Sequence, residues 1–288
     1  MSLFDTRSLV PLIALVAACG TKDASKTATN ASDSTHVVAI VPHQMTINAS
    51  EYKFDAPDQV PAGLMMVHLV DNGNEVHHVA FIKLNDGKTM ADVEQALKNP
   101  GPMPSWAVDN GGVNAPHPGG GMATTTQMLE PGNYALMCFV PDAHGVPHFA
   151  KGMVRSLTVV PDSGATAALP AADITLTLDN YSFTTSKPIT AGSHTIKVEN
   201  NASQSHEVQL VRLAPGKKAS DVTAWVEKPI GPPPGEPIGG VPAMAHGASA
   251  YVSADFTPGD YALICFLPDA KDGKPHYTHG MIEQLHVE

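Results

Sequence analysis

Basic residues are scarce in this sequence, which has 17 lysines and arginines against 28 aspartates and glutamates and a formal net charge of −11. Proteins that bind nucleic acids neutralise the phosphate backbone with clustered lysine and arginine side chains, so a nucleic-acid partner is not expected. Long stretches of helix-forming residues are also few, whereas 25 prolines and 24 glycines are spread along the 288 residues. This composition favours short strands joined by many turns, and we expect an all-β fold.

An apolar run at residues 9–18 follows Arg7 and ends in small residues directly before Cys19. It is too short to cross a bilayer and is typical of a secretory signal. Its end, VAACG, resembles the lipobox of bacterial lipoproteins, in which the cysteine becomes the acylated first residue of the mature chain. We therefore predict a lipoprotein signal peptide at 1–18, lipidation of Cys19, and a lipid anchor to a membrane of the cell envelope on its periplasmic, extracytoplasmic face. A secretory peptide cleaved nearby is the alternative, and it predicts export too. Residues 19–42 have little to bury, which predicts a flexible tether.

The rest of the chain repeats itself once. HHVAFIKL at 77–84 corresponds to HEVQLVRL at 206–213, and YALMCFVPDA at 134–143 corresponds to YALICFLPDA at 261–270. Two long copies indicate a duplicated domain rather than a solenoid, which needs several shorter units. The predicted limits are 43–160 for domain 1, 161–171 for the linker and 172–288 for domain 2.

Hydrophobic and polar residues alternate within each copy, as at 45–49 and at 174–178. Strict alternation predicts strands that bury one face. Each copy also contains one short helical segment between its histidine strand and its cysteine strand, near 89–99 and near 219–228. The sequence therefore predicts two tandem β-sandwiches, each with a short inserted helix.

Each copy carries four metal-binding side chains in the same order: a histidine early, then a cysteine, a histidine and a methionine near the end. One thiolate and two imidazoles in a plane, with a weak axial thioether, form the ligand set of a type 1 (blue) copper site. Soft sulfur favours Cu(I) and nitrogen suits Cu(II), so the natural use of such a site is one-electron transfer. The predicted metal ligands are His77, Cys138, His148 and Met153 in the first copy, and His206, Cys265, His276 and Met281 in the second.

The spacing of these residues resembles that of the cupredoxins. In both copies the cysteine ends an apolar strand, four residues separate the second histidine from the methionine, and an alternating strand follows the first histidine. These features look like plastocyanin-type proteins, while the distance from cysteine to second histidine looks closer to the type 1 site of copper nitrite reductases. The resemblance implies Greek-key sandwiches with one copper per domain, and it places His148 and His276 toward the exposed edge. The loops at 139–147 and 266–275 are longer than in the short-loop blue-copper proteins, so a sandwich that has lost its metal is the alternative.

Other assignments of these side chains stay open. A disulfide between Cys138 and Cys265 would require equivalent points of two domains to meet. His144 lies in the same loop as His148 and is an alternative ligand. The residue after the first histidine is His78 in one copy and a glutamate in the other, which favours the first histidine as the ligand. We expect solvated positions for the remaining loop histidines, His117, His246 and His279.

These observations predict a membrane-tethered cupredoxin that passes single electrons to a redox protein or to a membrane electron-transfer complex. An enzyme is not expected, because the sequence lacks the His-x-His pairs and the His-Cys-His motif that build a trinuclear copper cluster. If both domains are type 1 domains, the second copper of a nitrite reductase has no evident place either. The alternative is a non-redox cupredoxin-like structural subunit that docks on a larger respiratory or photosynthetic membrane complex, or a protein that binds and delivers copper.

Overall fold

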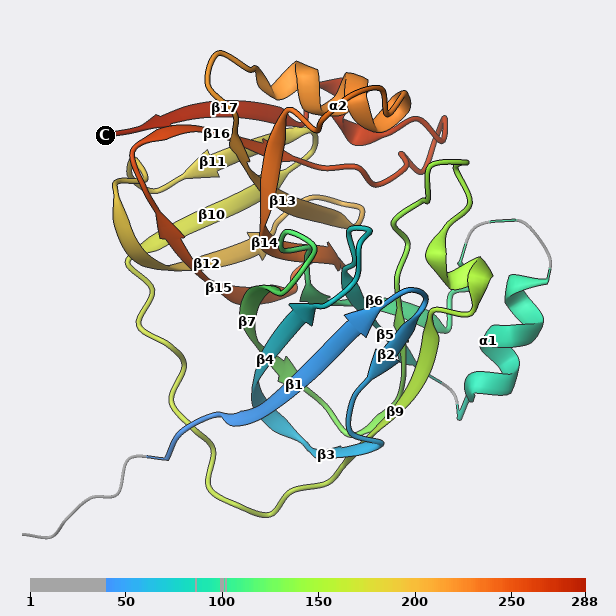
Figure 1. Ribbon diagram of the computed structural model, residues 1–288. Coiled ribbons are helices and arrows are strands. Elements are labelled where there is room, and N and C mark those ends of the chain that lie inside the picture. The colour runs from blue at the N-terminus through green and yellow to red at the C-terminus, as the bar shows by residue number, and fades with distance from the viewer. Residues whose placement is uncertain (1–39, 86, 99–100, 102) are drawn as a thin grey trace, which may run out of the picture. The chain divides into compact units, whose positions relative to one another are not determined.

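A computed structural model describes residues 40–85, 87–98, 101 and 103–288. The predicted signal peptide, Cys19 and residues 19–39 of the predicted tether lie outside these described residues. Within the described part, no helix combines the length and the apolar character needed to pass through a membrane. Strands make up most of the described chain (Figure 1), which confirms the predicted all-β fold class.

One sheet contains eight strands, four from each repeat. In order across the sheet they are β11 (Ser182–Thr185), β10 (Ile174–Asp179), β12 (Gly192–Asn200), β15 (Ser249–Phe256), β7 (Gly121–Leu129), β4 (Gly63–Asp71), β1 (His43–Ser50) and β2 (Lys53–Asp55). β1 runs parallel to β4, and β10 runs parallel to β12, so the two halves have the same internal arrangement. The halves join where β7 pairs antiparallel with β15.

The other sheet contains nine strands. In order they are β17 (Ile282–Val287), β16 (Gly259–Ile264), β13 (His206–Leu213), β14 (Gly235–Met244), β6 (Ala107–Val113), β5 (Val79–Leu84), β8 (Gly132–Met137), β9 (Val154–Val160) and β3 (Gln59–Pro61). β14 and β6 come from different repeats and meet at the pair Met244 and Asn110. Because both sheets run through the two repeats, the domain limits at 43–160 and 172–288 stay a prediction.

Two hydrophobic clusters fill the space between the sheets, one within each repeat. The apolar residues that alternate at 45–49 in β1 and at 174–178 in β10 are buried, as predicted from the sequence. Burial of such apolar surface is the main force that holds a sandwich together. The predicted pair of cupredoxin-like β-sandwiches is confirmed.

Each repeat adds one α-helix and one short 3-10 helix. These are α1 (Met90–Leu97), η1 (His148–Lys151), α2 (Ala219–Glu227) and η2 (His276–His279). α1 packs its apolar side on β5 and β8, and α2 packs on β13 and β16, so each covers the outer face of the nine-stranded sheet in its own repeat. A carboxylate fixes the start of each helix: Asp92 accepts the Thr89 N–H at 2.9 Å, and Asp221 accepts the Lys218 N–H at 2.8 Å. The inserted helices expected near 89–99 and 219–228 are therefore present.

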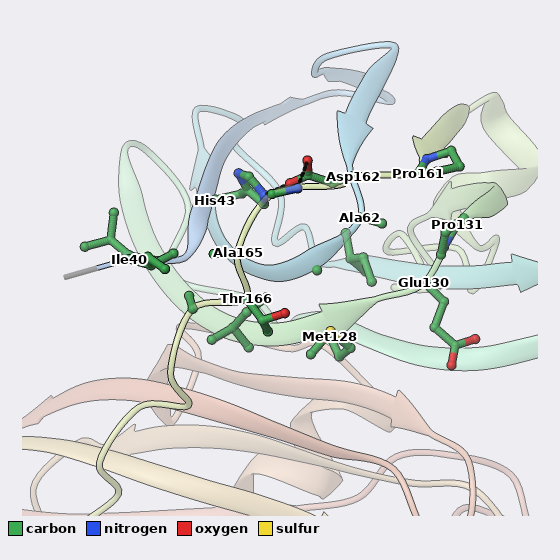
Figure 2. A pocket seen from close by; sticks show the side chains of 16 residues that line it. Ile40, His43, Ala62, Met128, Glu130, Pro131, Pro161, Asp162, Ala165 and Thr166 are labelled. Atoms are coloured by element: carbon green, nitrogen blue, oxygen red, sulfur yellow. Dashed lines mark hydrogen bonds and ion pairs between the residues drawn. The ribbon is translucent and has the colours of Figure 1, made fainter. Parts of the chain in front are cut away.

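A surface hollow lies beside β1 and the segment that follows β9 (Figure 2). The residues that line it come from the chain before β1, the start of β4, the end of β7 and the predicted linker. His43 Nε2 lies 2.9 Å from Asp162 Oδ2 and ties the start of β1 to this linker. None of the eight predicted metal ligands belongs to the lining residues, so the hollow is separate from the candidate metal centres.

Candidate metal centres

The loop after β16 positions three of the four predicted ligands of the second repeat. Cys265 follows directly on β16, His276 opens η2, and Met281 comes directly after Gly280, whose φ of 106° ends that helix. The Cys265 N–H donates to Met281 O at 3.1 Å, and the Met281 N–H donates to His276 O at 3.1 Å. These backbone bonds draw the cysteine, histidine and methionine toward one point.

A cysteine and two histidines converge in the second repeat. Sγ of Cys265 lies 3.3 Å from Nδ1 of His276 and 3.8 Å from Nδ1 of His206. The three donor atoms all lie within 4.8 Å of one another. His206 starts β13, the strand that pairs with β16, so it approaches from the neighbouring strand. These three side chains and Met281 are fully buried.

Burial keeps this donor set uncharged. Loss of solvation raises the pKa of the Cys265 thiol, and the nearby Glu207 carboxyl adds to the effect. Loss of solvation, followed by the proximity of His276, lowers the pKa of His206 to about 4. Loss of solvation lowers the pKa of His276 as well. At neutral pH a neutral thiol therefore faces two neutral imidazoles.

This donor set fits a soft cation. The thiol has one proton and can donate it to only one of the two Nδ1 atoms that face it. Nε2 of His206 and Nε2 of His276 are buried without a hydrogen-bond partner in the described structure, so neither ring is fully satisfied. A cation would accept electron pairs from the sulfur and both nitrogens at once. Two imidazoles and one thiolate, with Met281 buried beside them in sequence and backbone contact, match the ligand chemistry of type 1 copper.

Side chains from other loops cover His276. The ring of Tyr181 stands edge-on to it, with ring centroids 5.5 Å apart. The Tyr181 hydroxyl and the Gln204 amide both donate to Asp269, and these hydrogen bonds hold the pKa of that carboxyl well below its usual range. Asp269 Oδ2 lies 3.8 Å from Nε2 of His276. The resemblance implied a place for His276 toward the exposed edge, but the structure buries its ring beneath Tyr181 and Asp269.

The first repeat follows the same local plan at three of its four predicted ligands. Cys138 follows β8, its N–H donates to Met153 O at 3.2 Å, and the Met153 N–H donates to His148 O at 3.0 Å. Sγ of Cys138 lies 3.5 Å from Nδ1 of His148. All three side chains are fully buried. Loss of solvation raises the pKa of the Cys138 thiol to about 12.

His77 of the first repeat is held by a different partner. Its Nδ1 lies 2.8 Å from Oδ1 of Asp71, and its backbone N–H donates to Oδ2 of the same carboxylate at 2.9 Å. A carboxylate only accepts hydrogen bonds, so Nδ1 is the ring nitrogen that carries the proton and is not free to bind a metal. Among the described residues, no group of donor atoms within 4.8 Å of one another includes His77. The first repeat therefore brings Cys138 and His148 together and leaves Nδ1 of His77 on Asp71.

The residues after the two early histidines link the repeats. The Phe139 N–H donates to Nε2 of His78 at 2.9 Å, and the Phe266 N–H donates to Oε1 of Glu207 at 2.9 Å. Because Nε2 of His78 is the acceptor, its Nδ1–H donates to Oδ1 of Asn114, 3.2 Å away. Nδ2 of Asn114 lies 3.5 Å from Oε2 of Glu207. One buried chain of hydrogen bonds thus connects the two cysteine loops.

The remaining alternatives from the sequence are also placed. Cys138 and Cys265 are both free and buried, which removes the disulfide alternative. His148, and not His144, faces Cys138. The histidines with exposed positions are His117, His144, His246 and His279.

Sequence reasoning missed Asp71, Asn114 and Glu207. A signal for Asp71 was present, because the repeats differ there by a carboxylate against an amide at the same distance before the first histidine. Asn114 gave no such signal, since its partners lie in the other repeat and belong to a different strand.

No protein-family model matches the chain, and no curated protein does. Similar solved structures include a sodium-dithionite-reduced auracyanin from Roseiflexus castenholzii, 22% identical over 41% of this chain and 97% of that chain, with a TM-score of 0.28. Auracyanin B is 21% identical over 44% of this chain and 95% of its own, with a TM-score of 0.30. The copper nitrite reductase from Nitrosomonas europaea is 15% identical over 86% and 94%, with a TM-score of 0.25. These similarities are weak, and the fold described above stands on the strand pairing and the cores of this chain.

Proposed function

We propose that this protein is a copper-dependent, one-electron carrier whose metal is held by the donor set of the second repeat. The observation that carries the proposal is the buried convergence of Cys265 with His206 and His276, whose Nδ1 atoms lie 3.8 and 3.3 Å from its sulfur. Copper bound there supplies a Cu(II)/Cu(I) couple. The chain holds the thiolate, the two imidazoles and the thioether of Met281 in one arrangement and excludes water from them.

The surroundings of this donor set support electron transfer more than catalysis. A metal that binds a substrate needs an open coordination position. The four side chains of the set are fully buried, and Tyr181 and Asp269 cover the His276 side. The backbone bonds that close the loop from Cys265 to Met281 fix the ligands, which limits rearrangement when the metal changes its oxidation state. We therefore propose a carrier and not an enzyme.

We further propose that the protein works at the extracytoplasmic face of a membrane, tethered through Cys19, and exchanges electrons with a redox protein or a membrane electron-transfer complex. The support is the apolar run at 9–18 with its lipobox-like end. The net charge of −11 favours a partner with a basic docking surface, because complementary charge speeds encounter. Expression of Cys19→Ser with its signal intact tests the anchor: we expect a soluble exported protein, and membrane association equal to the wild type would contradict the anchor.

Copper reconstitution tests the carrier. Cu(II) added to the mature chain should give an intense visible absorption band from thiolate-to-copper charge transfer, and the band should disappear and return on reduction and reoxidation. Cys265→Ser should remove most of this band while leaving the fold intact, as circular dichroism can verify. Colourless, copper-free protein after loading would overturn the proposal and support the structural subunit, whereas copper binding without the band would support copper delivery.

A further inference from the structure

The two repeats differ at two positions just before the first histidine. Alignment on that histidine pairs Asp71 with Asn200 and Gly73 with Ala202. In the first repeat the histidine ring is held away from the cysteine, and in the second its Nδ1 faces the cysteine. The two differences together explain this contrast.

Asp71 and Asn200 build the same turn but act differently on the histidine. Oδ1 of each accepts the backbone N–H two residues further on, at 3.0 Å in both repeats. The carboxylate of Asp71 has acceptor capacity left and takes both the backbone N–H and the ring Nδ1–H of His77. Nδ2 of Asn200 instead donates to two backbone carbonyl oxygens at 2.9 and 2.8 Å. An NH2 group only donates, so it offers no acceptor for the ring of His206.

Gly73 provides the space for the His77 ring. A Cβ at Gly73 would lie 2.5 Å from Cε1 and 2.8 Å from Nδ1 of that ring, closer than real contacts allow. Ala202 carries such a Cβ at the matching position of the second repeat. The ring of His206 is therefore excluded from the place that His77 occupies.

We infer that Asp71, using the space at Gly73, withdraws His77 from the donor set of the first repeat, so that the chain assembles one Cys, His, His plane, in the second repeat. The inference rests on the proposed copper site at Cys265. Asp71 is a positioning residue, since it acts on the metal position only through His77. Before Nδ1 of His77 can bind copper, a buried hydrogen bond to a carboxylate must break, which lowers the affinity by roughly tenfold or more.

Two serine variants separate the repeats. Cys138→Ser leaves the second donor set intact, and Cys265→Ser leaves the first. With one bound Cu(II) per chain, we expect Cys138→Ser to keep the thiolate band of the wild type and Cys265→Ser to show a band at least about tenfold weaker. Bands of equal intensity in the two variants would overturn this inference and leave the proposed function standing, whereas a wild-type chain without the band would overturn both.

Rescue variants test the role of Asp71 itself. In the Cys265→Ser background, Gly73→Ala and Asp71→Asn should each strengthen the band, because they displace the His77 ring or remove its charged acceptor. Gly73 does not have a positive φ, so alanine fits its backbone. The reciprocal change, Asn200→Asp with Ala202→Gly in the Cys138→Ser background, should weaken the band. Rescue variants that bind copper with an unchanged band would contradict the role of Asp71.

A measurement without copper completes the test. Nitrogen-15 NMR of the metal-free wild type should show His77 as the tautomer with the proton on Nδ1, and Asp71→Asn should remove this signature. His77 with its proton on Nε2 in the wild type would overturn the inference whatever the copper spectra show. A purely structural role of Asp71 would change stability but would not move the tautomer or the band.

Discussion

Glu207 should make the folded protein less stable above neutral pH than below it. The side chain is 4% exposed, and loss of solvation raises the pKa of this carboxyl to about 7 from 4.5, against hydrogen bonds from Phe266 and Asn114 that lower it. A group whose pKa is raised by folding contributes stability that is fully present below its unfolded pKa and is lost as the pH rises through its folded pKa. The window is therefore pH 4.5 to 7. At about 1.4 kcal/mol per pKa unit, the loss is about 3 kcal/mol.

The variant Glu207→Gln isolates this effect, because glutamine keeps the size of the side chain and an oxygen that can accept the Phe266 N–H. The assay is denaturant unfolding of both proteins between pH 4 and pH 8.5. We expect the free energy of unfolding of the variant, relative to the wild type, to rise by about 3 kcal/mol across the window. The difference between the two proteins cancels the other titrating groups, which they share.

His78 occupies the matching place in the first repeat and provides a control with the opposite sign. Loss of solvation lowers the pKa of His78 to about 4 from 6.5, so its contribution to stability is lost as the pH falls through this range. His78→Gln should therefore gain about 3 kcal/mol relative to the wild type on acidification from pH 6.5 to 4. A difference that stays flat with pH for Glu207→Gln, or one of the same sign in both variants, would refute the reasoning.

Three further changes test the packing and the metal site. Gly240→Ala would place a Cβ 2.0 Å from Val208 O at a φ of 127°, so we expect a loss above about 3 kcal/mol in thermal unfolding; Gly216→Ala, at a φ of 75° with open space around it, should cost only about 1 kcal/mol. Asn114→Ala removes a buried bridge between the repeats and should cost about 2 to 4 kcal/mol, and an unchanged melting temperature would contradict the bridge. Met281→Leu should leave the fold intact but shift the reduction potential of the copper-loaded protein, and an unchanged potential would show that the thioether is not a ligand.

The sandwich was predictable because its signals are local. Alternation at 45–49 and 174–178 reports one buried face per strand, and the structure buries those residues. The arrangement of cysteine, second histidine and methionine was also predictable in outline, since all three lie on one short loop that backbone hydrogen bonds close. Local pattern and local geometry agree at these positions.

The parts that the sequence did not predict depend on contacts between distant segments. The position of the His77 ring is decided by whether a carboxylate or an amide stands at 71 and by the space at Gly73, and neither effect follows from residue spacing. The joining of the two repeats into continuous sheets depends on pairing between β7 and β15, far apart along the chain. The burial of His276 depends on Tyr181, which comes from another loop.

X-ray absorption at the copper edge of the copper-loaded Cys138→Ser protein tests the central claim most directly. The account predicts a copper ion bound by one sulfur at short distance and two histidine nitrogens, because Cys265, His206 and His276 are the donors that converge. Copper surrounded only by nitrogen and oxygen, with no short sulfur bond, would contradict it.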